Sequence, residues 1–154
     1  MKCKLCLSIS NKILCMECEK YYLFDNKINM IRKKKHKNCN TKEYNSETLL
    51  YKNLCKIYGY KDVYRHVYPS WSISNKGALL EFDIYIHSIK VCVEYDGIQH
   101  YQYPNFFHKR RRDFNDQKIR DLLKNKLARE NNQILYRFRY DELIDEINVK
   151  RRIK

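Results

Sequence analysis

Apolar residues recur with helical spacing in one segment near the middle of the chain. Leu50, Leu54 and Ile57 follow the three- and four-residue intervals of a buried helical stripe, and Gly59 stands where a C-terminal cap belongs. Glu47 extends the same stripe by one step toward the N-terminus. The pattern therefore predicts an amphipathic helix from about residue 46 that carries a carboxylate on its buried side.

Strand-like runs follow this helix. Apolar and aromatic residues dominate Val63–Tyr68, Leu79–Ile86 and Val91–Tyr95, and because only a few residues separate the last two runs, they predict an antiparallel hairpin. A second helix is predicted over Phe114–Glu130 and a last strand over Ile134–Tyr140. The order of helix, three strands, helix and strand is typical of an α/β domain.

Acidic residues fall on both strands of the predicted hairpin. Strand alternation puts Asp83 on the same face as Glu81, and it puts Glu94 and Asp96 on the same face as Cys92. Carboxylates gathered in a sheet repel one another and cost stability unless a cation or a shared proton offsets them. A hard divalent cation such as Mg²⁺ or Mn²⁺ is the natural counterion for oxygen ligands, and it also promotes phosphodiester hydrolysis.

A glycine and a histidine follow the second acidic strand. We expect Gly97 to let the backbone turn, which would bring His100 back toward Glu94 and Asp96. An imidazole in that place can act as a general base, as the acid for the leaving group or as a cation that contacts phosphate. The alternative is that these acids form surface ion pairs and that His100 caps a turn. The set on adjoining strands favours the first interpretation.

Together these motifs resemble the PD-(D/E)XK nucleases, the restriction-endonuclease-like superfamily. The closest likeness is to the branch that contains very-short-patch-repair endonucleases and homing-type nucleases of phages and giant viruses. The matching features are Glu47, Asp83, Glu94-x-Asp96-Gly97-x-Gln99-His100, Asp121-x-x-Lys124-Asn125 and Ile134-Leu135-Tyr136-Arg137. The resemblance implies a mixed sheet flanked by helices, in the order noted above, and Mg²⁺-dependent cleavage or nicking of DNA.

The resemblance also implies roles for single residues. Asp83 and Glu94 would be the principal metal ligands, Glu47 would bind the metal or orient water, and His100 would assist proton transfer. The simplest form of the motif has lysine two residues after the glutamate, where this chain has Asp96. In the related branch the cation comes from the following helix.

Lys124 is the candidate for that cation. The apolar arc predicted to bury the second helix consists of Ile119, Leu122, Leu123 and Leu127. Asp121 and Lys124 lie off this arc, whereas Asp116 extends it, so Asp116 competes with them for the site. A solvated ion pair between Asp121 and Lys124 is the alternative.

Four of the seven cysteines form two Cys-x-x-Cys pairs separated by eight residues: Cys3, Cys6, Cys15 and Cys18. This spacing is typical of tetrahedral thiolate coordination of zinc, and four thiolates leave no open position for water. We therefore expect a structural zinc knuckle or ribbon at residues 1–24, which the metal would help to fold. Cys55 and Cys92 are expected to be packed thiols.

The chain is strongly basic, with a formal net charge of +14 from 32 Lys plus Arg against 18 Asp plus Glu. The basic runs contain Lys33, Lys34 and Lys35, then Lys109, Arg110, Arg111 and Arg112. The first run lies in a segment, residues 25–45, predicted to be a linker or arm because it holds almost nothing apolar. Both runs are expected to contact phosphates, although a merely solvated charge run remains the alternative for the first.

Aromatic residues precede the second basic run. Tyr101, Tyr103, Phe106 and Phe107 would either stack on nucleotides or close the core beneath the loop. The basic surface makes nucleic acid, foremost DNA, the expected partner of a nuclease domain at residues 46–154. The sequence leaves open whether the chain forms a homodimer or joins a larger complex.

Neither a membrane span nor a signal peptide is visible, so we expect a soluble intracellular protein, in the cytoplasm or nucleus of a host if it is viral. The composition and the resemblance favour a virus or phage as the source. A second hypothesis is a non-catalytic, zinc-containing nucleic-acid-binding subunit of a larger nucleic-acid-processing or transcription complex, with a virus as one source of that complex.

Overall fold

The computed structural model describes residues 22–33, 46–105 and 110–153. Its sheet has six strands in the spatial order β1 to β6. The strands are β1 (Tyr22–Asp25), β2 (Met30–Lys33), β3 (Val63–Pro69), β4 (Phe82–Ile86), β5 (Val91–Asp96) and β6 (Ile134–Arg139). All neighbours are antiparallel except β5 and β6, which are parallel. The predicted α/β class with a mixed sheet is confirmed.

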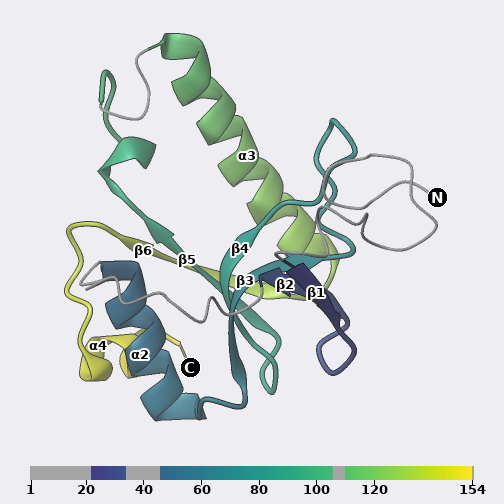
Figure 1. Ribbon diagram of the computed structural model, residues 1–154. Coiled ribbons are helices and arrows are strands. Elements are labelled where there is room, and N and C mark those ends of the chain that lie inside the picture. Colours follow the sequence, from purple (N-terminus) through teal and green to yellow (C-terminus); the bar gives the residue numbers. More distant parts are fainter. Residues whose placement is uncertain (1–21, 34–45, 106–109, 154) are drawn as a thin grey trace.

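The helices cover both faces of this sheet. They are α2 (Ser46–Tyr58), α3 (Arg111–Glu130) and α4 (Glu146–Arg152), and a short 3-10 turn, η1 (Ile98–His100), follows β5. In Figure 1, α2 and α4 lie on one side of the sheet and α3 lies on the other. Within the described ranges, no helix has the length and apolarity that a bilayer span requires.

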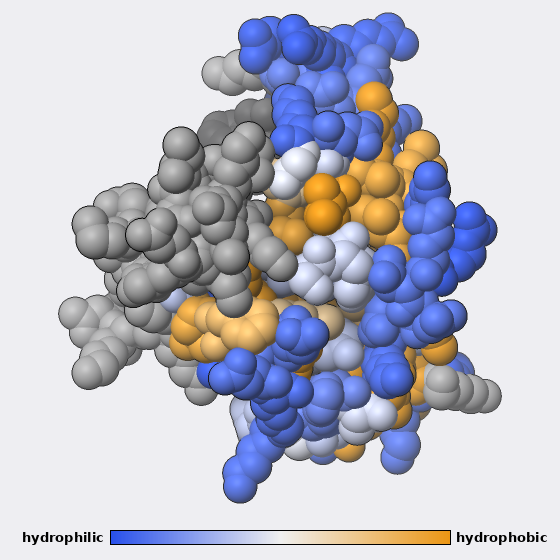
Figure 2. Space-filling model, turned by 90° about the vertical axis from the view of Figure 1, so that its right-hand side faces the viewer, coloured by the Kyte–Doolittle hydropathy of each residue, from blue (hydrophilic) through white to orange (hydrophobic). Residues whose placement is uncertain are grey.

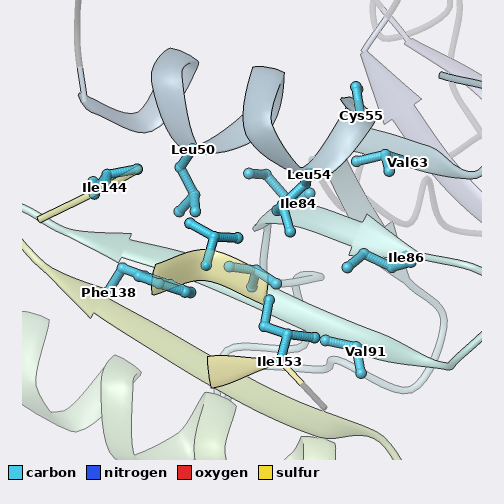
Figure 3. Packing of buried hydrophobic residues seen from close by; sticks show 12 residues of the cluster. Leu50, Leu54, Cys55, Val63, Ile84, Ile86, Val91, Phe138, Ile144 and Ile153 are labelled. Carbon is cyan, nitrogen blue, oxygen red and sulfur yellow. The ribbon is translucent and has the colours of Figure 1, made fainter. Parts of the chain in front are cut away.

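The main core lies between the sheet and the pair α2 and α4 (Figure 3). Leu50 and Leu54 of α2 are fully buried there, as the helical stripe predicts, and they meet Ile84 and Val93 of the central strands. The helix ends at Tyr58, and Gly59 follows with a φ of +90°, the left-handed conformation that favours glycine after a helix. The predicted bounds of this helix are confirmed.

The predicted hairpin is confirmed as β4 and β5, which pair antiparallel with Ile84 opposite Val93. The chain then crosses over through α3 and returns as β6, parallel to β5. A parallel pair requires such a crossover, and this one lays α3 across the face of the sheet opposite to α2. Cys55 and Cys92 are buried thiols outside any disulfide, as expected.

Residues 22–33 differ from the interpretation of residues 25–45 as a linker. They form the antiparallel pair β1 and β2, which extends the sheet beyond β3. Ile28, Met30 and Ile31 are buried. Three apolar residues ahead of the basic run therefore hold this strand pair against the rest of the sheet. The boundary expected at residue 24 falls inside β1. The paired cysteines Cys3, Cys6, Cys15 and Cys18 lie outside the described residues, as do Lys34, Lys35 and Lys109.

The prediction for the buried face of α3 is only partly confirmed: Leu123 and Leu127 of the predicted arc are half-buried, but the other two residues are exposed. Ile119 and Leu122 are 54% and 68% exposed, and Asp116 is exposed with them. The side chains that are buried or half-buried on this helix include Phe114, Gln117, Asp121, Lys124 and Ala128, which recur every three or four residues. The helix therefore turns a largely polar face toward the sheet, because its partners there are charged.

Candidate active site

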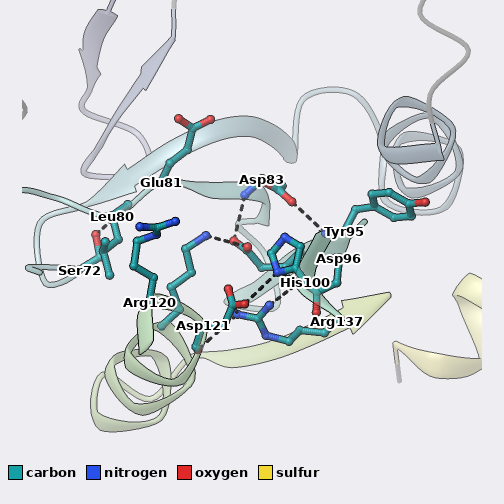
Figure 4. Close-up of polar contacts among 12 residues, drawn as sticks. Ser72, Leu80, Glu81, Asp83, Tyr95, Asp96, His100, Arg120, Asp121 and Arg137 are labelled. Carbon is teal, nitrogen blue, oxygen red and sulfur yellow. Dashed lines mark hydrogen bonds and ion pairs between the residues drawn. The ribbon is translucent and has the colours of Figure 1, made fainter. Parts of the chain in front are cut away.

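Two carboxylates lie where the ladder between β4 and β5 ends. Past the pair Ile84 and Val93, the backbone N–H of Asp83 donates to Glu94 Oε1 at 3.3 Å. The backbone N–H of Tyr95 donates to Asp83 Oδ2 at 2.9 Å. Each side chain thus accepts a backbone N–H of the opposite strand (Figure 4). The convergence of Asp83 and Glu94 that alternation predicts is confirmed.

Lys124 of α3 forms an ion pair with Glu94, one of these two carboxylates. Its Nζ lies 2.7 Å from Glu94 Oε2, and the side chains of Lys124 and Glu94 are only 14% and 3% exposed. Burial raises the pKa of Glu94 from 4.5 to about 7, although the charge of Lys124 opposes the rise. Burial also raises the pKa of Asp83, again against the effect of Lys124. Such carboxylates favour a bound proton or a bound cation.

His100 of η1 lies beside this trio and is held by acids. Its Nδ1 is 2.8 Å from Asp121 Oδ2 and 3.6 Å from Asp96 Oδ1. Burial opposes protonation of the ring, but the hydrogen bond with Asp121 and the two negative charges outweigh it, so the pKa of His100 is raised. Gln117 donates to Asp121 Oδ1 at 3.1 Å and steadies the pair. The proximity of His100 to the acids, expected from sequence, is present.

Asp96 has a different place from Asp83 and Glu94. It is 3% exposed and accepts from Arg137 Nη1 of β6 at 2.6 Å, and it also accepts from the hydroxyl of Tyr101 at 3.2 Å. Arg137 reaches Asp121 as well, at 3.5 Å. Asp96 and Arg137 therefore brace His100 and Asp121 from the β6 side instead of lining the cleft (Figure 4).

An open cleft of about 480 Å³ brings these elements together. It is lined by Glu47 of α2, Asp83 of β4, Glu94 of β5 and Lys124 of α3, with η1 contributing Gln99 and His100. Glu47 lies at the α2 side, where Arg65 Nη2 donates to its Oε1 at 2.7 Å. It contributes charge near Asp83 but is tied to Arg65.

Gly97 does not serve a special turn, and the space beside it is occupied by the Gln99 amide. Its φ of −65° and ψ of 170° are open to any residue, which corrects the expectation of a special backbone conformation. A Cβ at this position would lie 2.3 Å from Gln99 Oε1, so a larger residue would push the Gln99 amide away from its present position in the cleft.

Several predicted residues lie away from the cleft. Asp116 is exposed on the outer face of α3. Arg110, Arg111 and Arg112 are exposed at the N-terminal end of α3, which lies at the hydrophilic upper end of the view in Figure 2. Lys33 is the last residue of β2.

Sequence reasoning missed Gln117 and gave Arg137 no role. The polar residues Gln117, Asp121 and Lys124, spaced by three and four along one helix, were the available signal for an inward polar face.

The carboxylates present fit magnesium or manganese. Asp83 and Glu94 offer hard oxygen donors, and Mg²⁺ is ordinarily held by one or two carboxylates, with water and substrate phosphate completing the octahedron. Across the part of the chain that the structure describes, no three His, Cys, Asp or Glu side chains gather as a metal cage.

Comparisons with known proteins find viral relatives over part of the chain. It is 39% identical over 72 residues, 47% of its length, to the uncharacterized protein 307L of Invertebrate iridescent virus 6. It is 35% identical over 71 residues, 46% of its length, to the uncharacterized protein 033L of Invertebrate iridescent virus 3. It is 47% identical over 49 residues, 31% of its length, to the uncharacterized protein 094L of Frog virus 3 (isolate Goorha).

The chain spans about a third of the length of these relatives, with 36%, 37% and 32% of each covered. No family model matches the chain. No solved structure matches it either. The relatives are consistent with the viral source that the composition favours.

Proposed function

We propose that this chain is a metal-dependent endonuclease that hydrolyses phosphodiester bonds in DNA, and that residues 46–154 form a PD-(D/E)XK-type core. The observation that carries the proposal is the trio of Asp83, Glu94 and Lys124 in an open cleft, with Glu94 almost fully buried. Two acids and a lysine from three different elements are the groups that such a reaction needs in one place.

The cost of this arrangement supports a functional origin. Burying charged groups is unfavourable even when they are paired, and apolar residues of similar volume often stabilise a fold as well or better. Perturbed carboxylates in a cleft therefore mark candidate sites of chemistry. Here α3 turns Gln117, Asp121 and Lys124 inward while Ile119 and Leu122 stay exposed, which stability alone would not favour.

The roles follow from the contacts. Asp83 and Glu94 would hold a divalent ion, which would supply Lewis-acid polarisation of the phosphate. Lys124 offsets the negative charge of Glu94 and presents an ammonium group to the cleft. His100, oriented by Asp121, takes a proton from the attacking water or gives one to the leaving oxygen.

The order of elements supports the proposed core. Helix α2, the meander of β3, β4 and β5, the crossover helix α3 and the parallel strand β6 follow one another as the resemblance implies. The strands β1 and β2 are additions at the β3 edge. The net charge of +14 supports a polyanionic substrate.

A cleavage assay tests the proposal. Supercoiled plasmid and labelled single strands are incubated with the full chain in Mg²⁺ or Mn²⁺, and Asp83→Asn and Glu94→Gln are compared with the native chain. Asp116→Asn is the matched control, because this acid is exposed and outside the cleft. We expect each cleft variant to lose at least about 100-fold in rate and the control to keep it.

Two outcomes would overturn the proposal. Cleavage that persists at the native rate in both cleft variants would come from a contaminant. Binding without cleavage in either metal would favour the alternative, a non-catalytic nucleic-acid-binding subunit.

A further inference from the structure

Two rings and a guanidinium, of which Tyr101 and Arg139 are exposed and Tyr140 is half-buried, lie near the ends of β5 and β6. The carbon Cζ of Arg139 is 4.6 Å from the centre of the Tyr101 ring and 5.8 Å from that of Tyr140. The two rings lie 5.9 Å apart at an angle of 50°. We call Tyr101, Arg139 and Tyr140 the stacking cluster.

The guanidinium of the stacking cluster is held in one plane. Asp141 accepts from Arg139 Nε at 2.9 Å and from Arg139 Nη2 at 2.8 Å, in a two-bond arrangement. This pairing offsets the charge of Arg139 and occupies one edge of its guanidinium, so its capacity for a phosphate is reduced. Arg139 lies over one face of the Tyr101 ring. Tyr101 is nevertheless 41% exposed, so the cluster offers the ring and guanidinium surface that this contact leaves open.

The stacking cluster is linked through Asp96 to His100, which lines the cleft. Tyr101 follows His100 in the chain, and its hydroxyl donates to Asp96 Oδ2 at 3.2 Å. The other oxygen of Asp96 is 3.6 Å from His100 Nδ1. Tyr101 and His100 are thus neighbours both in the chain and through Asp96.

We propose that the stacking cluster binds the face of an unpaired base next to the phosphate at the cleft. The preferred substrate is thus DNA that is single-stranded or locally unpaired. Stacking on tyrosine and arginine faces is the common way in which proteins hold unpaired bases, and it works for any base. In a closed duplex the neighbouring pairs cover these faces, so the cluster distinguishes the two forms. That the bound strand is cleaved beside this base rests on the proposed function, whereas the stacking of the base does not.

Binding to a fluorescent strand tests the inference. The probe is an oligothymidylate that carries one 2-aminopurine, used alone or annealed to its complement, and stacking quenches its fluorescence. All proteins are full chains that also carry Asp83→Asn, which removes the proposed cleavage and leaves the stacking cluster intact. Tyr101→Ala and Tyr101→Leu remove the ring, Tyr101→Phe removes only the hydroxyl, and Tyr60→Ala alters an exposed tyrosine outside the cluster.

We expect Tyr101→Ala and Tyr101→Leu to weaken binding of the single strand by about 5- to 100-fold and to relieve the quenching. Duplex binding should change by less than about twofold, since its bases are covered. Tyr101→Phe and Tyr60→Ala should leave both affinities and the quenching as they are.

The inference fails if loss of the ring weakens single strand and duplex equally, or leaves single-strand binding unchanged. This failure is distinct from failure of the proposed function. Cleavage that depends on Asp83 without a strand preference would reject only the stacking cluster. Ring-dependent binding of single strands by a chain that never cleaves would reject only the nuclease.

Discussion

The metal-free protein should become less stable as the pH rises from about 5 to about 8. The folded-state pKa of Glu94 is raised from 4.5 to about 7, mainly by burial. A group with a raised pKa contributes stability below its unfolded pKa, and that contribution is lost as the pH rises through the folded value. The difference corresponds to about 3 kcal/mol at about 1.4 kcal/mol per pKa unit. Asp83, whose pKa is also raised, adds to the loss.

Asp83→Asn is the perturbation that isolates the carboxylate pair. Burial is the largest cause of the raised pKa of Glu94, and the charge of Lys124 opposes it. The negative charge of Asp83 is the next cause that raises this pKa. An asparagine oxygen can still accept the N–H of Tyr95, so the strand contact is kept. Removing the charge should reduce the pH-dependent loss by on the order of 1 kcal/mol. The variant should therefore be more stable than the native chain at about pH 8 without metal.

Urea unfolding in chelator, followed by circular dichroism at both pH values, measures these differences. Millimolar Mg²⁺ should then stabilise the native chain at the higher pH, by about 2.7 kcal/mol if the ion is at 100 times its Kd, and should not stabilise the variant. The contribution of His100 to the stability of the fold is also lost as the pH rises, because its folded-state pKa is raised. The test is therefore the difference between the two proteins. Equal losses and equal responses to Mg²⁺ would refute the coupling of Asp83 to Glu94.

Three further expectations concern α3 and the core. Lys124→Met should cost about 3 kcal/mol at about pH 8 and less at about pH 5 in urea unfolding, because it leaves its buried carboxylate partner unpaired. Asp121→Asn should lower the pKa of His100 in an NMR titration and move the histidine-dependent limb of the cleavage profile to lower pH; an unmoved limb would exclude Asp121 as its positioning residue. Leu54→Ala should cost about 2–5 kcal/mol in thermal or urea unfolding, whereas Leu122→Ala should change stability by less than about 0.5 kcal/mol, and a large loss in the latter would place it in an interface.

The elements with strong local patterns were predictable from sequence. The helix at Leu50 and Leu54 and the hairpin of β4 and β5 follow from simple periodicity and a short connection. The same alternation predicted that Asp83 and Glu94 face each other, because cross-strand neighbours share a face of the sheet. Lys124 was predicted from a resemblance, since spacing alone does not say which lysine of a helix reaches a strand 30 residues earlier in sequence.

The strands β1 and β2, which extend the sheet beyond β3, could not be predicted from composition. Ile28, Met30 and Ile31 precede a run of lysines, and the charge of that run outweighs three apolar residues in any average over the segment. Their burial depends on β3 offering a free edge, which is a tertiary property. The four paired cysteines, with their predicted zinc, lie outside the described residues and stay a prediction.

The orientation of α3 shows why hydrophobic periodicity predicts burial only in part at a site of chemistry: Leu123 and Leu127 are half-buried, whereas Ile119 is exposed. A hydrophobic arc predicts burial only when the surface opposite the helix is apolar, and here that surface carries Glu94, Asp96 and Arg137. Lys124 and Asp121 gain more from these charges than Ile119 would gain from burial among them, because an unpaired buried charge costs several kcal/mol and an exposed isoleucine side chain costs about 1.5–3 kcal/mol. The helix therefore turns toward its charged partners. Its orientation is coupled to the charge state of the cleft, so the groups proposed to bind metal are also those that hold the helix in place.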